Sequence, residues 1–116
     1  MIVDLGLPNV GLLYQPTIFK ADAALSQFRL QKDLIRHLHL QNRNPDLTFA
    51  TMLDGVIPWD RIIKESAPGV DATLEFLPAG ICRVEDFDLK ETLIQARAEA
   101  DYVRELIARR SASSAD

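Results

Sequence analysis

The stretch from Asp88 to Arg110 constrains the fold of this chain most, because its apolar residues recur at the spacing of an amphipathic helix. One stripe of that helix consists of Leu89, Leu93, Ala96, Ala100, Val103 and Ile107. Asp88 suits the N-cap, and Glu91 three residues later can complete a capping box. Arg109 and Arg110 stand where the negative end of the helix dipole favours cations. The pattern predicts a long helix that packs on the domain through this stripe.

A second apolar set lies at steps of four on roughly the opposite side of the same helix. It consists of Ile94, Ala98, Tyr102 and Leu106. A helix on a sheet buries only one face, and burial of a large aliphatic side chain stabilises by roughly 1.5 to 3 kcal/mol. The helix is therefore either wedged between two parts of its own fold or offers this set to a second copy or another protein. In the second case Arg97, Asp101 and Glu105 form the charged rim of the interface.

Two elements precede the middle of the chain. Residues 1–19 are apolar but interrupted by glycine and proline, which predicts an extended arm over the domain's own core or over a neighbouring subunit. Residues 21–41 predict a second long helix, ended by Pro45 and its preceding residues. The apolar arc of that helix consists of Ala24, Phe28, Leu30, Leu34, Ile35 and Leu38.

The middle of the chain predicts shorter elements. Residues 46–55 alternate like a strand, yet their flanking cap residues favour a short helix, and Pro58 suits the first turn of another short helix through Ser66. Residues 70–76 alternate apolar and polar as a strand does, and Pro78-Ala79-Gly80 followed by residues 81–86 predicts the returning strand of a hairpin. We therefore expect an α+β fold in which two long amphipathic helices and one or two short helices pack on a small antiparallel β-hairpin sheet.

Length and composition set the class of protein. At 116 residues the chain predicts one domain over 1–110 with a disordered tail at 111–116. No run approaches the roughly 20 apolar residues of a membrane span, so we expect a cytoplasmic protein without membrane contact. The single cysteine, Cys82, excludes an internal disulfide and suits a small buried position, while Trp59 suits a core anchor.

Five residues could recognise phosphate if residues 29–43 form a basic helix. They form one basic stripe of Arg29, Lys32, Arg36, His39 and Arg43. Such a stripe can follow a nucleic-acid backbone, but most are solvated faces, and the formal net charge of -4 disfavours nucleic-acid binding.

The only histidines are His37 and His39. On a helix, residues two apart point about 200° from each other, so the pair would not hold one metal ion, whereas on a strand both would lie on one face. The chain has no glycine-rich phosphate loop and no Gly-x-Ser-x-Gly elbow. We expect no cofactor, no metal and no catalytic residues of a known motif type.

These patterns favour a non-enzymatic accessory or adaptor subunit that acts by protein-protein contact and self-associates through its C-terminal helix as a homodimer or larger assembly. One alternative is a nucleic-acid-associated regulator that uses the basic stripe. Another is a small ligand-binding protein or enzyme with a pocket between the hairpin and the two long helices.

Overall fold

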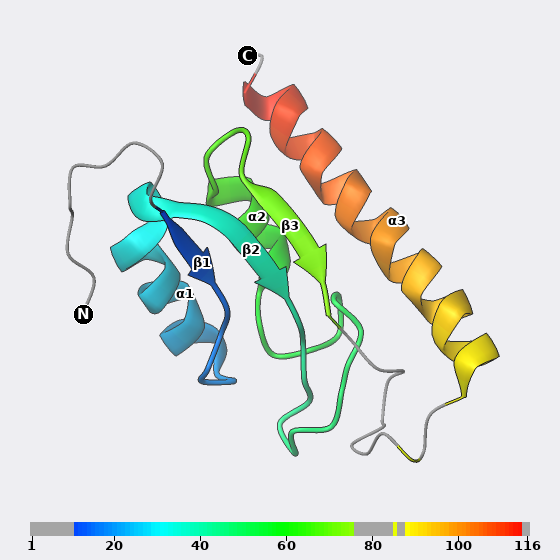
Figure 1. Cartoon of the computed structure of the whole chain (residues 1–116). Coiled ribbons are helices and arrows are strands. Elements are labelled where there is room, and N and C mark those ends of the chain that lie inside the picture. The colour runs from blue at the N-terminus through cyan, green and yellow to red at the C-terminus, as the bar shows by residue number, and fades with distance from the viewer. Residues whose placement is uncertain (1–10, 76–84, 86–87, 115–116) are drawn as a thin grey trace.

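The computed structural model describes residues 11–75, 85 and 88–114, with the backbone alone for 111–114 (Figure 1). Strands and helices alternate along the chain up to the long C-terminal helix. In order, they are β1 Leu12–Tyr14, α1 Ala21–Gln31, the 3₁₀ helix η1 Lys32–Leu34, β2 Ile35–Leu40, α2 Trp59–Glu65, β3 Asp71–Leu74 and α3 Leu89–Ser114.

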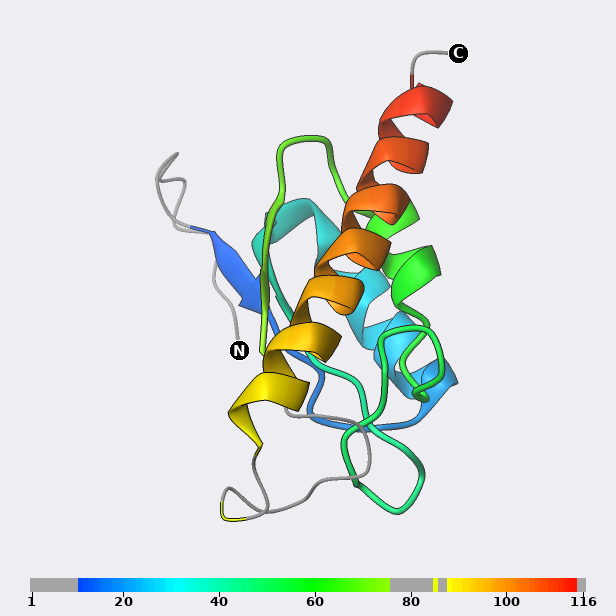
Figure 2. The same ribbon diagram turned by 90° about the vertical axis from the view of Figure 1, so that its right-hand side faces the viewer.

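The sheet has three strands in the order β1-β2-β3, and both pairings are parallel. Leu13 lies opposite His37 in the first pair, and His37 lies opposite Asp71 in the second. Each crossover moves one strand further in the same direction, so crossovers of one hand place α1 and α2 on the same face of the sheet. Figures 1 and 2 show this layering, with α3 beside β3 and next to α2.

The core lies between the sheet and this helix layer. Tyr14 of β1 is buried, and its ring meets Phe28 of α1 and Trp59 of α2 edge-on at centroid distances of 5.5 and 6.1 Å. The Tyr14 hydroxyl donates to the Ala24 carbonyl oxygen at 2.9 Å, and burial raises the pKa of Tyr14 to about 12. Trp59 is 1% exposed and donates its indole N–H to the Gln41 carbonyl at 2.8 Å, as expected of a core anchor with a polar handle.

The helix α3 begins where the sequence predicts. The Asp88 side chain accepts a hydrogen bond from the Glu91 backbone N–H at 3.0 Å, which is the predicted N-cap contact. The helix then packs mainly through its second half, where Val103 and Leu106 enter the core. Its buried side also includes Glu99, whose carboxylate accepts the Met52 backbone N–H at 2.6 Å. Burial raises the pKa of Glu99, against the lowering effect of that hydrogen bond.

The structure combines helices and strands as predicted, but the expected antiparallel hairpin and pair of long helices are wrong. The sheet is entirely parallel, and residues 71–74 pair with β2, a strand that the sequence pattern did not predict. The predicted helix over 21–41 ends at Gln31 and turns through η1 into β2. Tertiary pairing on both sides of β2 outweighs the helical spacing of its leucines.

The structure also bears on the predictions for the middle and the two ends of the chain. The short helix predicted from Pro58 to Ser66 is confirmed as α2, which starts after Pro58. Residues 46–55 contain turns in place of the predicted short helix. The first ten residues of the expected arm, most of the returning strand at 81–86, Cys82 and the last two residues of the tail lie outside the described residues, whereas α3 extends to Ser114.

Candidate ligand site at the carboxyl edge of the sheet

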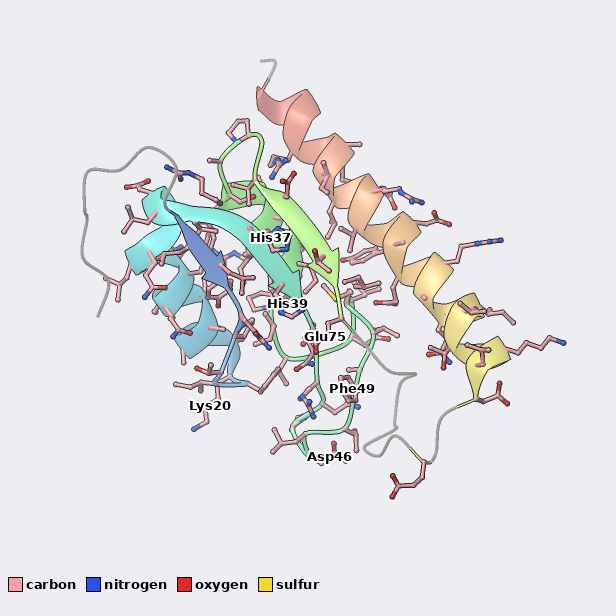
Figure 3. The ribbon with its side chains drawn as sticks, viewed as in Figure 1. Lys20, His37, His39, Asp46, Phe49 and Glu75 are labelled. Atoms are coloured by element: carbon pink, nitrogen blue, oxygen red, sulfur yellow. The ribbon has the colours of Figure 1, made fainter. Side chains whose placement is uncertain are left out.

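The carboxyl ends of the three parallel strands meet at one edge of the sheet. Gln15 directly follows β1, His39 is the next-to-last residue of β2, and Glu75 directly follows β3. Figure 3 shows His39 and Glu75 next to each other at this edge. In a parallel sheet the chain leaves every strand at this same edge, so side chains from different strands can meet there.

His39 joins the three strand ends through hydrogen bonds. Its Nε2 lies 2.9 Å from Glu75 Oε2, and its Nδ1 lies 3.3 Å from Gln15 Oε1. A protonated imidazolium donates to both oxygens, and its contact with Glu75 is then an ion pair. A neutral ring donates only one N–H, and the Gln15 amide, turned over, can donate to the other ring nitrogen. The site therefore provides hydrogen-bond partners for both protonation states of His39.

His37 extends the polar row along the same face of β2. The two histidines are two residues apart on a strand, so their side chains share a face, in contrast to the helical arrangement expected from the sequence. His37 Nε2 lies 2.8 Å from Thr73 Oγ1 on β3. Within the described ranges, no group of three or more His, Cys, Asp or Glu residues is placed to hold a metal ion. His39 and Glu75 supply two donors of suitable type for a metal ion.

This face of the sheet bears no helix among those that the structure describes, because α1 and α2 both lie on the other side (Figures 1 and 2). Leu13, 55% exposed, and the side chains of His39 and Glu75, 25% and 51% exposed, are open to solvent here. Parallel sheets normally have both faces covered. The contact between His39 and Glu75 is therefore accessible to a ligand.

The loop after β2 borders the site and is held by Asn42, which is 1% exposed. Its amide nitrogen donates to the carbonyl oxygens of Met52 and Ile57, both at 3.0 Å. Its amide oxygen accepts the backbone N–H groups of Ile57 and Arg43 at 2.9 and 3.0 Å. A Cβ added to Gly55 would lie 2.1 Å from Asn42 Cγ, so only glycine leaves room for this amide. The four hydrogen bonds fix the start of the loop against its end.

The outer part of the same loop is also ordered by polar contacts. The Arg43 guanidinium lies 4.2 Å from the Phe49 ring centroid and donates to the Leu47 carbonyl at 2.7 Å. The Asp46 carboxylate accepts the Thr48 hydroxyl at 2.6 Å and the Thr48 N–H at 3.0 Å, and these bonds lower the pKa of Asp46. Figure 3 shows Lys20, Asp46 and Phe49 at the carboxyl edge of the sheet.

The predicted basic stripe is divided among several elements. Arg29 lies on α1, Lys32 in η1, Arg36 and His39 on β2, and Arg43 in the loop that follows. Arg29 forms a two-pronged ion pair with Glu65 of α2, with both N···O distances at 2.9 Å. The hydrogen bond between these groups raises the pKa of Arg29 and lowers that of Glu65.

The predicted interface residues on α3 occupy different environments. Ile94 is 57% exposed and Ala98 is exposed, whereas Tyr102 packs against the core and Leu106 is buried within it. Leu89 and Leu93, from the stripe expected to pack on the domain, are 62% and 61% exposed. The apolar surface of α3 is thus concentrated in its first half.

Sequence reasoning singled out His39 for a different role and overlooked Gln15 and Glu75. The available signal was positional, since each is a polar residue at the end of an apolar strand segment. No helix in the described part of the chain is long and apolar enough to cross a membrane. Comparison with family models, curated proteins and solved structures finds no match to this chain.

Proposed function

We propose that this protein binds a small polar ligand at the carboxyl edge of its sheet, where the ligand replaces the Gln15 amide at His39 Nδ1 and exchanges a proton with that nitrogen. The observation that carries the proposal is the chain of contacts from Gln15 through His39 to Glu75, one residue from the end of each successive strand. Convergence of three separate strand ends on one imidazole favours a binding site over a chance surface contact.

The chemistry of these groups suits a ligand that carries hydroxyl or carboxylate groups. An imidazole with hydrogen-bond partners in both protonation states can act as a general acid or a general base. The exposed Glu75 carboxylate can accept a ligand hydroxyl, and the Gln15 amide can donate or accept. Hydrogen bonds of Asn42 and Arg43 fix the backbone of the loop that follows the strand carrying His39.

Matched variants test this site. We expect Glu75→Gln and His39→Gln to weaken ligand binding roughly 10- to 100-fold, because a hydrogen bond to a charged group contributes about 1.5 to 3 kcal/mol and each 1.4 kcal/mol is tenfold. The matched controls are Asp71→Asn, an exposed carboxylate on the same strand, and His37→Gln, two residues before His39. Both controls should retain binding.

The measurement is a titration followed by nuclear magnetic resonance, of the backbone amides in every variant and of the histidine ring nitrogens in the chains that retain His39. The probes are glycerol, lactate and inorganic phosphate, which separate hydroxyl, hydroxy-acid and phosphate recognition. The proposal requires that at least one probe shift the His39 ring signals in a saturable way. Equal binding by the His39→Gln and His37→Gln variants, or no shift with any probe, would contradict it.

Self-association through the first half of α3 is a second candidate function. The observation in its favour is the exposure of Leu89, Leu93 and Ile94, each more than half open to solvent. Together with Lys90 and Arg97, the last two line a hollow of about 380 Å³. Apolar side chains grouped on the surface of a small domain commonly mark a protein interface. A monomer mass at every protein concentration in light scattering would exclude this candidate.

A further inference from the structure

The outer edge of β3 presents backbone groups that do not face β2. Alternate residues of a parallel strand direct both their N–H and C=O groups to the same neighbour. The Glu75 N–H donates to the Leu40 carbonyl of β2 at 2.9 Å, so Asp71 and Thr73, of the same parity, also face β2. Ala72 and Leu74 therefore point their backbone groups away from β2, toward α3.

A cavity of about 460 Å³ lies between this strand edge and α3. Its walls are mainly apolar. The strand side includes Val70, Ala72 and Leu74, and the helix side includes Ala100, Val103 and Ile107. Figures 1 and 2 show α3 running past the outer side of β3. Among the described strands, none pairs with this edge of β3, and such edges are the usual templates for the addition of another strand.

The cavity also has a charged wall. Arg104 and Arg110 of α3 line it, and Asp71 is the acidic residue among the described lining residues. Arg110 is 9% exposed, and its Nη1 donates to the Ser66 hydroxyl at 2.8 Å, which fixes the guanidinium at the cavity. Arg104 donates to Asp101 at 3.0 Å in an exposed pair that is open to exchange. The helix side of the cavity therefore carries two guanidinium groups, those of Arg104 and Arg110.

We propose that the cavity between β3 and α3 takes up an extended polypeptide segment of a partner protein, in which apolar and acidic residues alternate. The segment adds to the sheet as a fourth strand through the backbone groups of Ala72 and Leu74. Its apolar side chains lie against Val103 and Ile107, and its carboxylates face Arg104 and Arg110. The inference is independent of the ligand site, which lies at the strand ends and on the uncovered face.

The probe is a synthetic acetylated and amidated hexapeptide of alternating valine and glutamate, added to the full chain labelled with ¹⁵N. We expect saturable binding that slows hydrogen exchange of the Ala72 and Leu74 amides at least tenfold, because both N–H groups enter new hydrogen bonds. The signals of the His39 ring should remain unchanged. Binding that leaves the exchange of both amides unaltered, or no binding at millimolar peptide, would overturn the proposal.

Two comparison peptides separate strand addition from simple apolar or ionic contact. A valine-glutamate peptide methylated on alternate backbone nitrogens keeps every side chain but lacks the N–H groups that pairing needs, and a valine-lysine peptide reverses the charge. Both should bind at least tenfold more weakly than the valine-glutamate peptide. Equal affinity for the N-methylated peptide would show that the backbone edge of β3 takes no part.

Substitutions on α3 test where the peptide binds. We expect Ile107→Lys to weaken peptide binding at least tenfold, because the change places an ammonium group on the apolar wall. Leu30→Lys, which places a lysine at an 87% exposed apolar position on α1, is the control and should bind as the unaltered chain does. Should Ile107→Lys fail to fold, Arg104→Glu tests the charged wall at an exposed position, and undiminished affinity in that variant would overturn the proposed wall of positive charge.

Discussion

At the scale of single residues, Asn42 has more structural consequence than its polar character suggests. We expect Asn42→Ala to lower the free energy of unfolding by about 3 to 5 kcal/mol, because it leaves buried carbonyl and N–H groups of Met52, Ile57 and Arg43 without their partner. The measurement is urea unfolding followed by circular dichroism. Asn44→Ala, which removes partly buried contacts with Thr48 and Phe49, is the control and should cost about 1 kcal/mol or less. Similar losses in the two variants would contradict the special role of Asn42.

Some features of the candidate site can be predicted from single positions in the sequence, and others cannot. His37 and His39 were recognisable as a pair, but their joint orientation depends on the strand that holds them. Gln15 and Glu75 are separated from His39 by 24 and 36 residues, and only the parallel register brings them to it. The sequence shows the chemistry of each side chain, whereas the order and register of the strands decide which side chains it meets.

At the scale of elements, α3 could be predicted and β2 could not. The start of α3 is encoded locally, since Asp88 caps the helix by itself. The side of α3 that packs on the domain is rotated from the predicted stripe, because Glu99 and Arg110 occupy enclosed positions through hydrogen bonds to Met52 and Ser66. The leucines of β2 fit a helix and a strand equally well, and its neighbours on both sides decide for the strand.

The uneven burial along α3 makes its cap a local determinant of stability. We expect Asp88→Ala to speed hydrogen exchange in the first turns of α3 about fivefold, since loss of an N-cap costs about 1 kcal/mol. The free energy of global unfolding should change little, because the residues of α3 that enter the core lie in its second half. Asp88→Asn keeps a capping oxygen and should exchange as the unaltered chain does. A decrease of about 1 kcal/mol in the free energy of global unfolding would instead show that the first half of α3 packs on the domain.

At the scale of the whole molecule, the exposed first half of α3 bears on the state of assembly. We expect light scattering after size exclusion to show a dimer or larger assembly that Ile94→Glu dissociates, because the change places a carboxylate in the apolar patch. Leu30→Glu, a change at an 87% exposed position on α1, is the matched control and should keep the assembly. Circular dichroism of both variants checks that the fold is retained. An unaltered molar mass of the Ile94→Glu variant would show that Ile94 takes no part in the contact between subunits.

The all-parallel sheet also has a consequence for how the chain reaches its native state. Leu12 pairs with Ile35, and His37 pairs with Asp71, so each strand pairing joins residues far apart in sequence, with a helix between them. A hairpin can start a sheet within a few residues, but among the described strands no such turn exists. Each pairing must close a long loop, whose entropy is lost before the contacts form. We therefore expect the helices of this chain to form first and the edge that brings His39 to its partners to be completed late.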